Sequence, residues 1–319
     1  MSGMKRTGDQ ASDREGPRVA VSIVVSWNVR GYLEKLLKDL QRQTGSWDHQ
    51  IVVVDNASED GSAEMVRDRF PGVCLLRNDS NLGFTAAVNQ AIRAFPEAHY
   101  YFLVNPDIRC GEEMLSRLIG ETEGHPRTGI AGCRIKTPTG RDITRTTYPR
   151  MTRGLMVEMK VFWWQWSGPR GRRAKPHWRE VECVEGSCML IRAEVILDIG
   201  FFDERFWAYF EETDFCLRAS GVGWRVTINP DLVVTHYCGR SFRQRPFERR
   251  LIWNRSFRRF LEKHHPLRAR VYPFLVRILW TMEYIVRSVG ALYSGRERLR
   301  AVDMEFKALF RDSPVHDAP

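Results

Sequence analysis

The chain has 319 residues, of which 43% are hydrophobic and 28% charged. This composition is typical of one large globular domain with an appendage, or of two domains. Lysine and arginine outnumber the acidic residues by 49 to 39, and the formal net charge of +10 favours partners that are nucleic acids, anionic membranes or phosphorylated substrates. The seven cysteines include no CxxC pair, which disfavours a zinc knuckle and favours free thiols in a reducing cytoplasm.

The chain begins with a polar segment. Residues 1–18 contain no apolar run of the kind that marks a signal peptide, so we expect a disordered lead, with folding beginning at Val19.

Strand-like and helix-like patterns alternate over the next 90 residues or so. Short apolar runs predict strands, and apolar spacing of three or four predicts helices between them. The expected strands are 19–28, 51–55, 73–76 and 100–104, and the expected helices are 33–43, 62–70 and a helix ending at 94. This alternation indicates an α/β fold with a doubly wound, mostly parallel sheet flanked by helices.

Polar residues follow three of these strands. Ligands of such sheets bind at the carboxyl ends of the strands, so the polar groups there should line one crevice. They are Trp27-Asn28, Asp55-Asn56 and Asn105-Pro106-Asp107.

The second half of the chain is less regular. Residues 141–179 are rich in Arg, Trp, Gly and Pro, and we interpret them as a long excursion, either a lid or acceptor platform or a disordered insertion. Strands are then expected at 184–191, 224–228 and 233–236, with helices at 193–199 and 210–220.

Residues 243–319 form a basic tail that predicts an amphipathic helical extension. On a helical wheel over residues 271–292, apolar side chains oppose an arc with Arg270, Arg277, Glu283 and Arg287. The charges recur too often for a membrane span. The helix either lies on an anionic bilayer surface or packs on the domain or a second subunit.

The strand-end residues suggest a site for a phosphorylated ligand. Asp107 could hold a divalent cation, although an Asn-Pro-Asp turn alone would also account for it. Asp55 could accept a hydrogen bond from a nucleotide base, and the loop from Asn81 to Gly83 could bring backbone amides near a phosphate. Helix capping and a plain turn are the structural alternatives.

A second acidic group lies further along the chain. Glu211, Glu212 and Asp214 occupy the start of a predicted helix, next to aromatic residues that suit a sugar-binding edge. A base that deprotonates a sugar hydroxyl must be a carboxylate or an imidazole, so these three are candidates. His236 ends the last predicted strand and is either a metal ligand or a buried strand-end histidine.

The order of these motifs resembles glycosyltransferase family 2, and within it the rhamnosyltransferase-type enzymes of bacterial surface polysaccharide assembly. The resemblance covers residues 19–242 and excludes the excursion. It rests on eight features: residues 21–28, 52–58, 81–84, 102–107, 185–187, 201–204 and 209–214, and His236.

The resemblance implies a GT-A fold, a nucleotide-sugar donor, Mg²⁺ or Mn²⁺, and a single displacement that inverts the anomeric carbon. By position, Asp107 and His236 would hold the metal, and Glu212 would be the catalytic base, with Glu211 and Asp214 as alternates. Asn105 replaces the first Asp of the family's Asp-x-Asp motif. The expected donor-binding residues are Ser26, Asn28, Asp55, Asn56, Asn81, Gly83 and Asn105.

The same resemblance implies a glycan or lipid-linked acceptor. The free thiols indicate a cytoplasmic location, and the basic tail, where it binds lipid, would place the protein at the inner face of the cytoplasmic membrane. A non-catalytic RNA-binding domain would account for the basic, Trp-rich stretch but not for the acidic groups, so no nucleic-acid partner is expected. A nucleotidyltransferase should carry a basic Gly-rich loop after the first strand, where Ser26-Trp-Asn-Val-Arg30 stands instead. No GxGxxG follows a strand, which disfavours a dehydrogenase.

Overall fold

A computed structural model describes residues 18–148, 178–238 and 246–292. The lead predicted at 1–18 lies outside the described residues except for Arg18. Most of the predicted excursion and the end of the predicted tail also lie outside them.

One mixed sheet forms the centre of the structure. In the described residues its strands run in the order β3-β2-β1-β4-β8-β6-β9-β5, and β7 pairs with β9. The strands are β1 Val19–Ser26, β2 Asp48–Asn56, β3 Cys74–Asn78, β4 Tyr100–Val104, β5 Ile108–Arg109, β6 Thr128–Lys136, β7 Arg179–Glu180, β8 Cys188–Arg192 and β9 Arg225–His236. The helices are α1 Arg30–Gln41, α2 Ser62–Arg69, α3 Phe84–Ala94, α4 Met114–Glu123, α6 Ala193–Ile199, α7 Glu211–Gly221, α8 Pro246–His264 and α9 Pro266–Leu292.

The two halves of the sheet differ in strand direction. Strands β3, β2, β1 and β4 are all parallel, as the sequence predicts. Strand β8 runs antiparallel to both β4 and β6, whereas β6 and β9 are parallel to each other. The predicted α/β class is therefore confirmed, with a parallel first half and a mixed second half.

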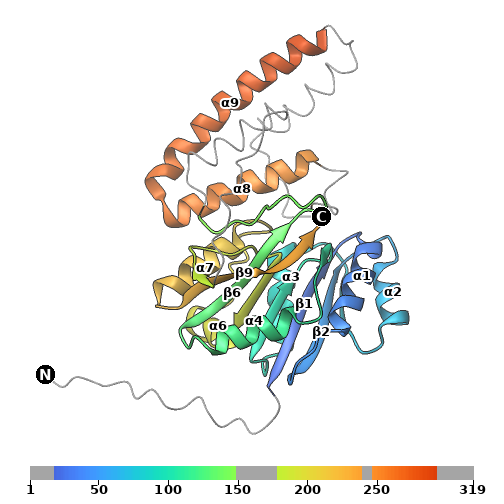
Figure 1. The fold of residues 1–319 in the computed structure, drawn as a ribbon. Helices are drawn as coiled ribbons and strands as arrows, with labels where there is room; N and C mark the ends of the chain where they lie inside the picture. The colour runs from blue at the N-terminus through green and yellow to red at the C-terminus, as the bar shows by residue number, and fades with distance from the viewer. Residues whose placement is uncertain (1–17, 149–177, 239–245, 293–319) are drawn as a thin grey trace, which may run out of the picture.

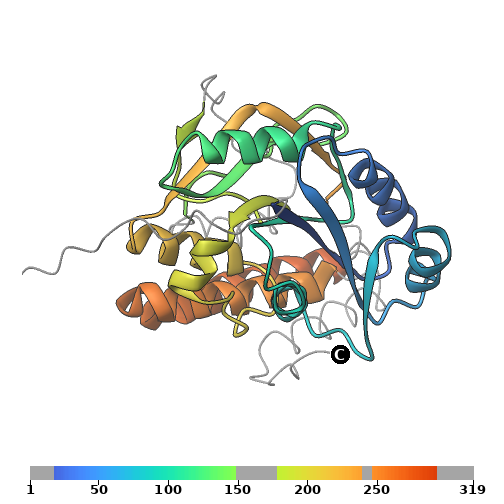
Figure 2. The same cartoon turned by 90° about the horizontal axis from the view of Figure 1, so that it is seen from below.

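Helices cover both faces of the sheet (Figures 1 and 2). Helix α1 buries Leu33, Leu36, Leu37 and Leu40, which recur at helical spacing, and packs on one face together with α2 and α4. Helices α3, α6 and α7 pack on the other face. Successive residues of a strand point to opposite faces, so Val24 of β1 joins the first core and Ile23 the second.

Strand β9 replaces two strands predicted separately. The expected break at Asn229-Pro230-Asp231 is a bulge within one strand, where the pairing with β6 shifts from Cys133↔Asn229 to Arg134↔Val233. Proline is tolerated at such irregular positions because it need not donate a ladder hydrogen bond there.

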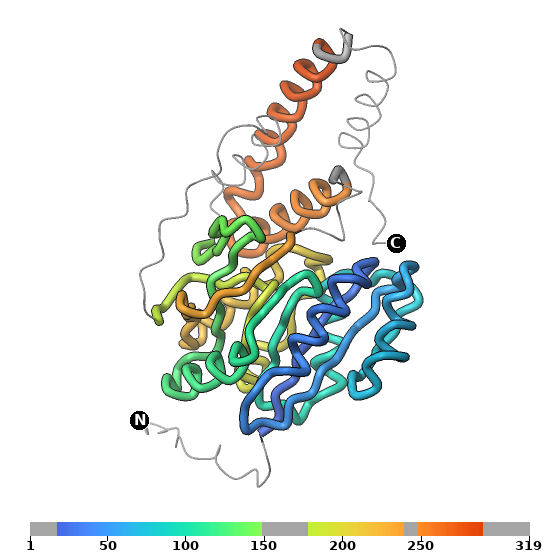
Figure 3. The backbone as a smooth tube through the Cα atoms, turned by 45° about the vertical axis from the view of Figure 1, so that its right-hand side comes forward, coloured from blue at the N-terminus to red at the C-terminus, as the bar shows by residue number. Residues whose placement is uncertain are grey.

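The described part of the predicted tail is helical. Helix α8 lies beyond the end of the sheet toward which β6 and β9 point, and α9 leads away from the sheet (Figures 1 and 3). A third apolar cluster joins α8 and α9 to the segment before α7, and Phe206, Phe257, Phe260 and Tyr272 are almost fully buried in it. No helix among the described residues is long and apolar enough to cross a membrane.

Candidate active site

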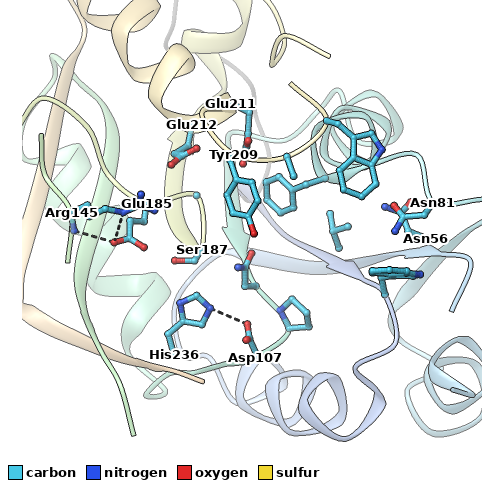
Figure 4. Close-up of a pocket in the computed structure, with 18 residues that line it drawn as sticks. Asn56, Asn81, Asp107, Arg145, Glu185, Ser187, Tyr209, Glu211, Glu212 and His236 are labelled. Atoms are coloured by element: carbon cyan, nitrogen blue, oxygen red, sulfur yellow. Dashed lines mark hydrogen bonds and ion pairs between the residues drawn. The ribbon is translucent and has the colours of Figure 1, made fainter. Parts of the chain in front are cut away.

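A cavity lies at the carboxyl ends of the strands, as expected for a sheet of this kind. Most of the predicted site residues line it: Asn56, Asn81, Asn105, Asp107, Glu211, Glu212 and His236. Five predicted residues are not part of its lining: Ser26, Asn28, Asp55, Gly83 and Asp214. Figure 4 places Glu211 and Glu212 on the opposite side of the cavity from Asp107 and His236.

Asp107 and His236 form a buried pair on one side of the cavity. Strands β5 and β9 are paired so that Ile108 lies opposite His236, and this register brings His236 Nε2 to 3.1 Å from Asp107 Oδ1. Burial disfavours the charged imidazole, but the hydrogen bond with Asp107 and the contact with Cys238 outweigh this and raise the pKa of His236 to about 10.

This pair supplies two potential ligands for a cation, which on binding would displace the proton from the His236 imidazole. No group of three or more His, Cys, Asp or Glu side chains suited to a metal occurs among residues 18–148, 178–238 and 246–292. A cation here would therefore depend on phosphate oxygens or water for its remaining ligands. Mg²⁺ in phosphate-binding sites is commonly held in this way, so the residues fit such an ion.

The ends of β2 and β3 anchor the loop that precedes α3. Asp55 is fully buried, and its Oδ2 accepts a hydrogen bond from the Ser58 amide at 2.9 Å. Its Oδ1 has no partner in the described part of the chain, so it could accept a further donor such as a base N–H. Asn56 Nδ2 donates to the carbonyl oxygen of Gly83 at 3.1 Å, and Asn78 Nδ2 donates to Asn56 Oδ1 at 2.8 Å.

Two other predicted donor-binding residues, Ser26 and Asn28, do not line the cavity. Asn28 donates its amide to Ser58 Oγ and accepts at Oδ1 from the Glu59 amide, which ties the loops after β1 and β2 together. Ser26 is fully buried at the end of β1.

The loop at Gly83 does not offer the free amides that the sequence predicts. The Gly83 amide donates to Asn81 Oδ1 at 3.0 Å, and the Phe84 amide donates to the Trp207 carbonyl oxygen at 2.8 Å. Gly83 has φ +88, and a Cβ there would lie 2.6 Å from Trp207 O. The glycine is needed for the close approach of Trp207, which itself lines the cavity.

Glu211 and Glu212 begin α7 and are almost completely buried. Burial raises the pKa of Glu211 well above its usual range, and the adjacent Glu212 raises it further. Burial also raises the pKa of Glu212, against the opposing effect of Arg145. Two neighbouring buried carboxyls with one nearby cation favour a state in which one is protonated and the other ionised.

Arg145 and Glu185 belong to the cavity, although the sequence assigned no role to either. The Arg145 amide donates to Glu185 Oε1 at 3.0 Å, and its side-chain Nε lies 3.3 Å from the same oxygen. Glu185 is part of the Glu-Gly-Ser motif noted in the sequence. No spacing or periodicity singles out Arg145 among the many arginines of the predicted excursion.

The backbone that leads into α7 is strained. Tyr209 and Phe210 both have positive φ, 69° and 70°, and each such residue costs about 1–3 kcal/mol. Phe210 is held in this conformation by aromatic contacts with three residues of α8, namely Trp253, Phe257 and Phe260. Helix α8 therefore helps to set the position at which α7 and its two glutamates begin.

Asp214 also contacts α8 and not the cavity. It is completely buried and forms ion pairs with Arg218, Lys263 and His264 at 2.7–2.8 Å. Its predicted role as an alternate base is not supported by this position, because its carboxyl oxygens face basic side chains outside the cavity lining.

Known proteins resemble this chain in sequence. The model for Glycosyl transferase family 2 matches residues 22–200, which is more than half of the chain. The N-acetylglucosaminyl-diphospho-decaprenol L-rhamnosyltransferase of Mycobacterium tuberculosis is 28% identical over 76% of this chain and 84% of its own length. The rhamnosyltransferase WbbL of Escherichia coli K12 is 31% identical over 76% of this chain and 98% of its own length.

Solved structures share the fold. The mannosyltransferase PcManGT from Pyrobaculum calidifontis, in complex with GDP-Man and Mn²⁺, has a TM-score of 0.53 at 17% identity, over 95% of this chain and 90% of that chain. GalNAc-T7, with UDP, GalNAc and Mn²⁺, has a TM-score of 0.55 at 12% identity, over 92% of this chain and 55% of that chain. Together with the family match, these findings show that the chain is a glycosyltransferase and belongs to glycosyltransferase family 2.

Proposed function

We propose that this enzyme transfers a sugar, for which we put forward rhamnose, from a nucleotide-diphosphate donor to a hydroxyl of a lipid-linked glycan acceptor, with inversion at the anomeric carbon. One observation carries the proposal: the Asp107–His236 pair and the Glu211–Glu212 pair line the same cavity from opposite sides (Figure 4). The first pair suits a cation and a diphosphate, and the second suits the removal of a proton.

The donor side of the site would be formed by the strand ends. Mg²⁺ or Mn²⁺, held by Asp107 and His236, would neutralise the charge of the diphosphate. Asp55 Oδ1 is buried and has no partner among the described residues, so it would suit a base N–H. Asn81 and Asn105 would offer side-chain amide groups to the rest of the donor, whereas Asn56 uses its own amide to hold the loop at Gly83.

Glu212 is the proposed base. The acceptor oxygen would form a bond to the anomeric carbon while the bond from that carbon to the diphosphate oxygen breaks, and the electron pair would leave with the nucleoside diphosphate. The acceptor proton would pass to Glu212, which Arg145 helps to keep ionised. Glu211 would remain protonated and neutral beside it, because its pKa is raised well above the usual range. Displacement from the face opposite the leaving group inverts the carbon.

The relatives support the finer parts of the proposal. Two of them are named as rhamnosyltransferases, and one is named for an acceptor on diphospho-decaprenol. By analogy we propose a lipid-linked acceptor and a place of action at the cytoplasmic face of the membrane.

The test is a transfer assay with the full chain, Mn²⁺, a panel of nucleotide sugars and lipid-linked acceptors, with released nucleotide as the readout. Glu212→Gln should reduce kcat about 10²–10⁴-fold and leave the affinity for the donor unchanged, because only the proton acceptor is lost. Asp107→Ala, by contrast, should lower both kcat and the affinity for the donor, because a ligand of the cation is lost. Glu97→Gln, at an exposed site, is the matched control and should behave like the wild type.

Near-normal turnover by Glu212→Gln would contradict the assignment of the base. Absence of turnover with every donor in the panel would contradict the proposed reaction.

A further inference from the structure

Helix α9 is fixed to the protein by one face. Ala269, Tyr272, Val276 and Trp280 recur at helical spacing and are buried in the cluster shared with α8. On the same side, the buried Glu283 forms an ion pair with Arg250 of α8 at 2.8 Å. The sequence alone placed Glu283 on a charged arc, but its carboxylate is enclosed between the two helices. The orientation of α9 about its own axis is therefore determined.

The opposite face of α9 is apolar and exposed. Its large side chains are 43–76% exposed: Leu267, Val271, Phe274, Ile278, Met282, Ile285, Val286 and Val289. Most of the exposed large apolar residues in the described part of the chain lie in this row. At 1.5 Å per residue the row is about 33 Å long. Patches of this extent mark a binding surface more often than a free one.

The charges beside the row are of one sign. The acidic residue of α9, Glu283, is buried, whereas Arg268 and Arg270 are exposed. At 100° per residue, Arg268 lies on one flank of the row and Arg270 lies on the other. Two copies of this face would bring arginines together, and the repulsion would oppose self-association. Lipid phosphates would instead neutralise them.

We propose that the outer face of α9 docks on an anionic lipid bilayer. The apolar row lies at the boundary between headgroups and acyl chains, and the flanking arginines contact lipid phosphates. The helix lies in the plane of the interface and does not span the bilayer.

This surface is connected to the cavity through α8. Ser256 Oγ donates to the carbonyl oxygen of Ala208 at 2.7 Å, and Ala208 lines the cavity. Together with the packing of Phe210 on α8, this contact makes the cavity and the docking face parts of one packed unit. Docking would hold the cavity near the membrane, where a lipid-linked acceptor lies. This benefit rests on the proposed function, whereas the docking itself does not.

The experiment is co-sedimentation of the full chain with vesicles of phosphatidylcholine alone, or of phosphatidylcholine with phosphatidylglycerol. The wild type should bind the anionic vesicles more tightly. The double variant Phe274→Glu/Ile278→Glu should lose at least tenfold in binding. Leu197→Glu, at an apolar side chain on α6 that is 81% exposed, is the matched control and should bind normally. Replacing Arg270 by Glu should weaken binding to anionic vesicles by about fivefold or more.

Circular dichroism and thermal unfolding establish that each variant is folded. Transfer to a soluble acceptor analogue should be unchanged in the α9 variants, because α9 does not line the cavity. Equal binding of the wild type and the Phe274→Glu/Ile278→Glu variant would overturn the proposal. So would a wild-type dimer that this variant converts to a monomer without any vesicle binding. Vesicle binding without sugar transfer would leave the docking intact and contradict the proposed function alone.

Discussion

Replacing Gly83 by alanine tests whether the contact with Trp207 shapes the cavity. The backbone at Gly83, with φ 88 and ψ 168, lies in a region that is essentially restricted to glycine, so an alanine there costs about 1–3 kcal/mol. The new Cβ would lie 2.6 Å from both Cδ1 and O of Trp207. Such overpacking costs about 1–3 kcal/mol more. We therefore expect the free energy of unfolding to fall by about 2–6 kcal/mol in total.

Two other glycines separate the cost of the backbone conformation from the cost of the steric contact. Gly140 has φ +79 but open space around a Cβ, so Gly140→Ala should cost only the backbone part, about 1–2 kcal/mol. Gly72 has neither a positive φ nor a close contact at a Cβ, so Gly72→Ala should be close to neutral. Urea denaturation measures all three, and thermal shift with donor and Mn²⁺ reports on the cavity. The reasoning is refuted if Gly83→Ala is no less stable than Gly140→Ala, or if it binds donor as well as the wild type does.

Two further predictions concern charge. The base must be ionised, so the rate of transfer should rise with pH. Arg145→Ala removes the cation that lowers the pKa of Glu212, so the rise in the pH–rate profile should move to higher pH. Arg145→Lys keeps a cation and should return the rise to its wild-type position. An unmoved profile in Arg145→Ala would exclude this role. Burial alone would raise the pKa of Asp214, but hydrogen bonds and ion pairs with its basic partners outweigh burial and lower this pKa. The ionised carboxylate therefore stabilises the fold above pH 3.8, and this stabilisation is lost as the pH falls. Asp214→Asn should lower the free energy of unfolding, measured by urea denaturation, by about 3–5 kcal/mol at neutral pH and by less in acid. The control Asp68→Asn, at an exposed site, should change it by at most about 0.5 kcal/mol. Equal effects of the two variants would contradict a structural role for Asp214.

The first half of the fold could be predicted because its strands are buried on both faces and its helices show clear apolar spacing. Strand ends in such a sheet converge, so the positions of Asn56, Asn105 and Asp107 followed from chain order alone. Helix α4 and strand β6 were not predicted, and the two strands expected at 224–228 and 233–236 are one bulged strand.

The rest of the site depends on contacts that are distant in sequence. Arg145 meets Glu185 across 40 residues, and Trp207 meets Gly83 across more than a hundred. The wheel of α9 predicted an apolar face and a charged one, but only its packing on α8 shows that Glu283 is buried and which apolar side chains stay exposed. The local sequence pattern does not indicate which distant residues will contact one another.

The contact between Phe210 and α8 has a consequence for how the enzyme can be divided. The segment shared with the family ends at residue 200, and the expected catalytic domain ends at 242, yet the aromatic residues that hold Phe210 lie at 253–260. A protein shortened to residue 242 would keep Phe206 and Phe210 but lose α8, so it would expose these two side chains to water and release the strained backbone ahead of α7. Because the proposed base lies on α7, we expect the smallest catalytic unit to extend through α8, into sequence that the family match does not cover.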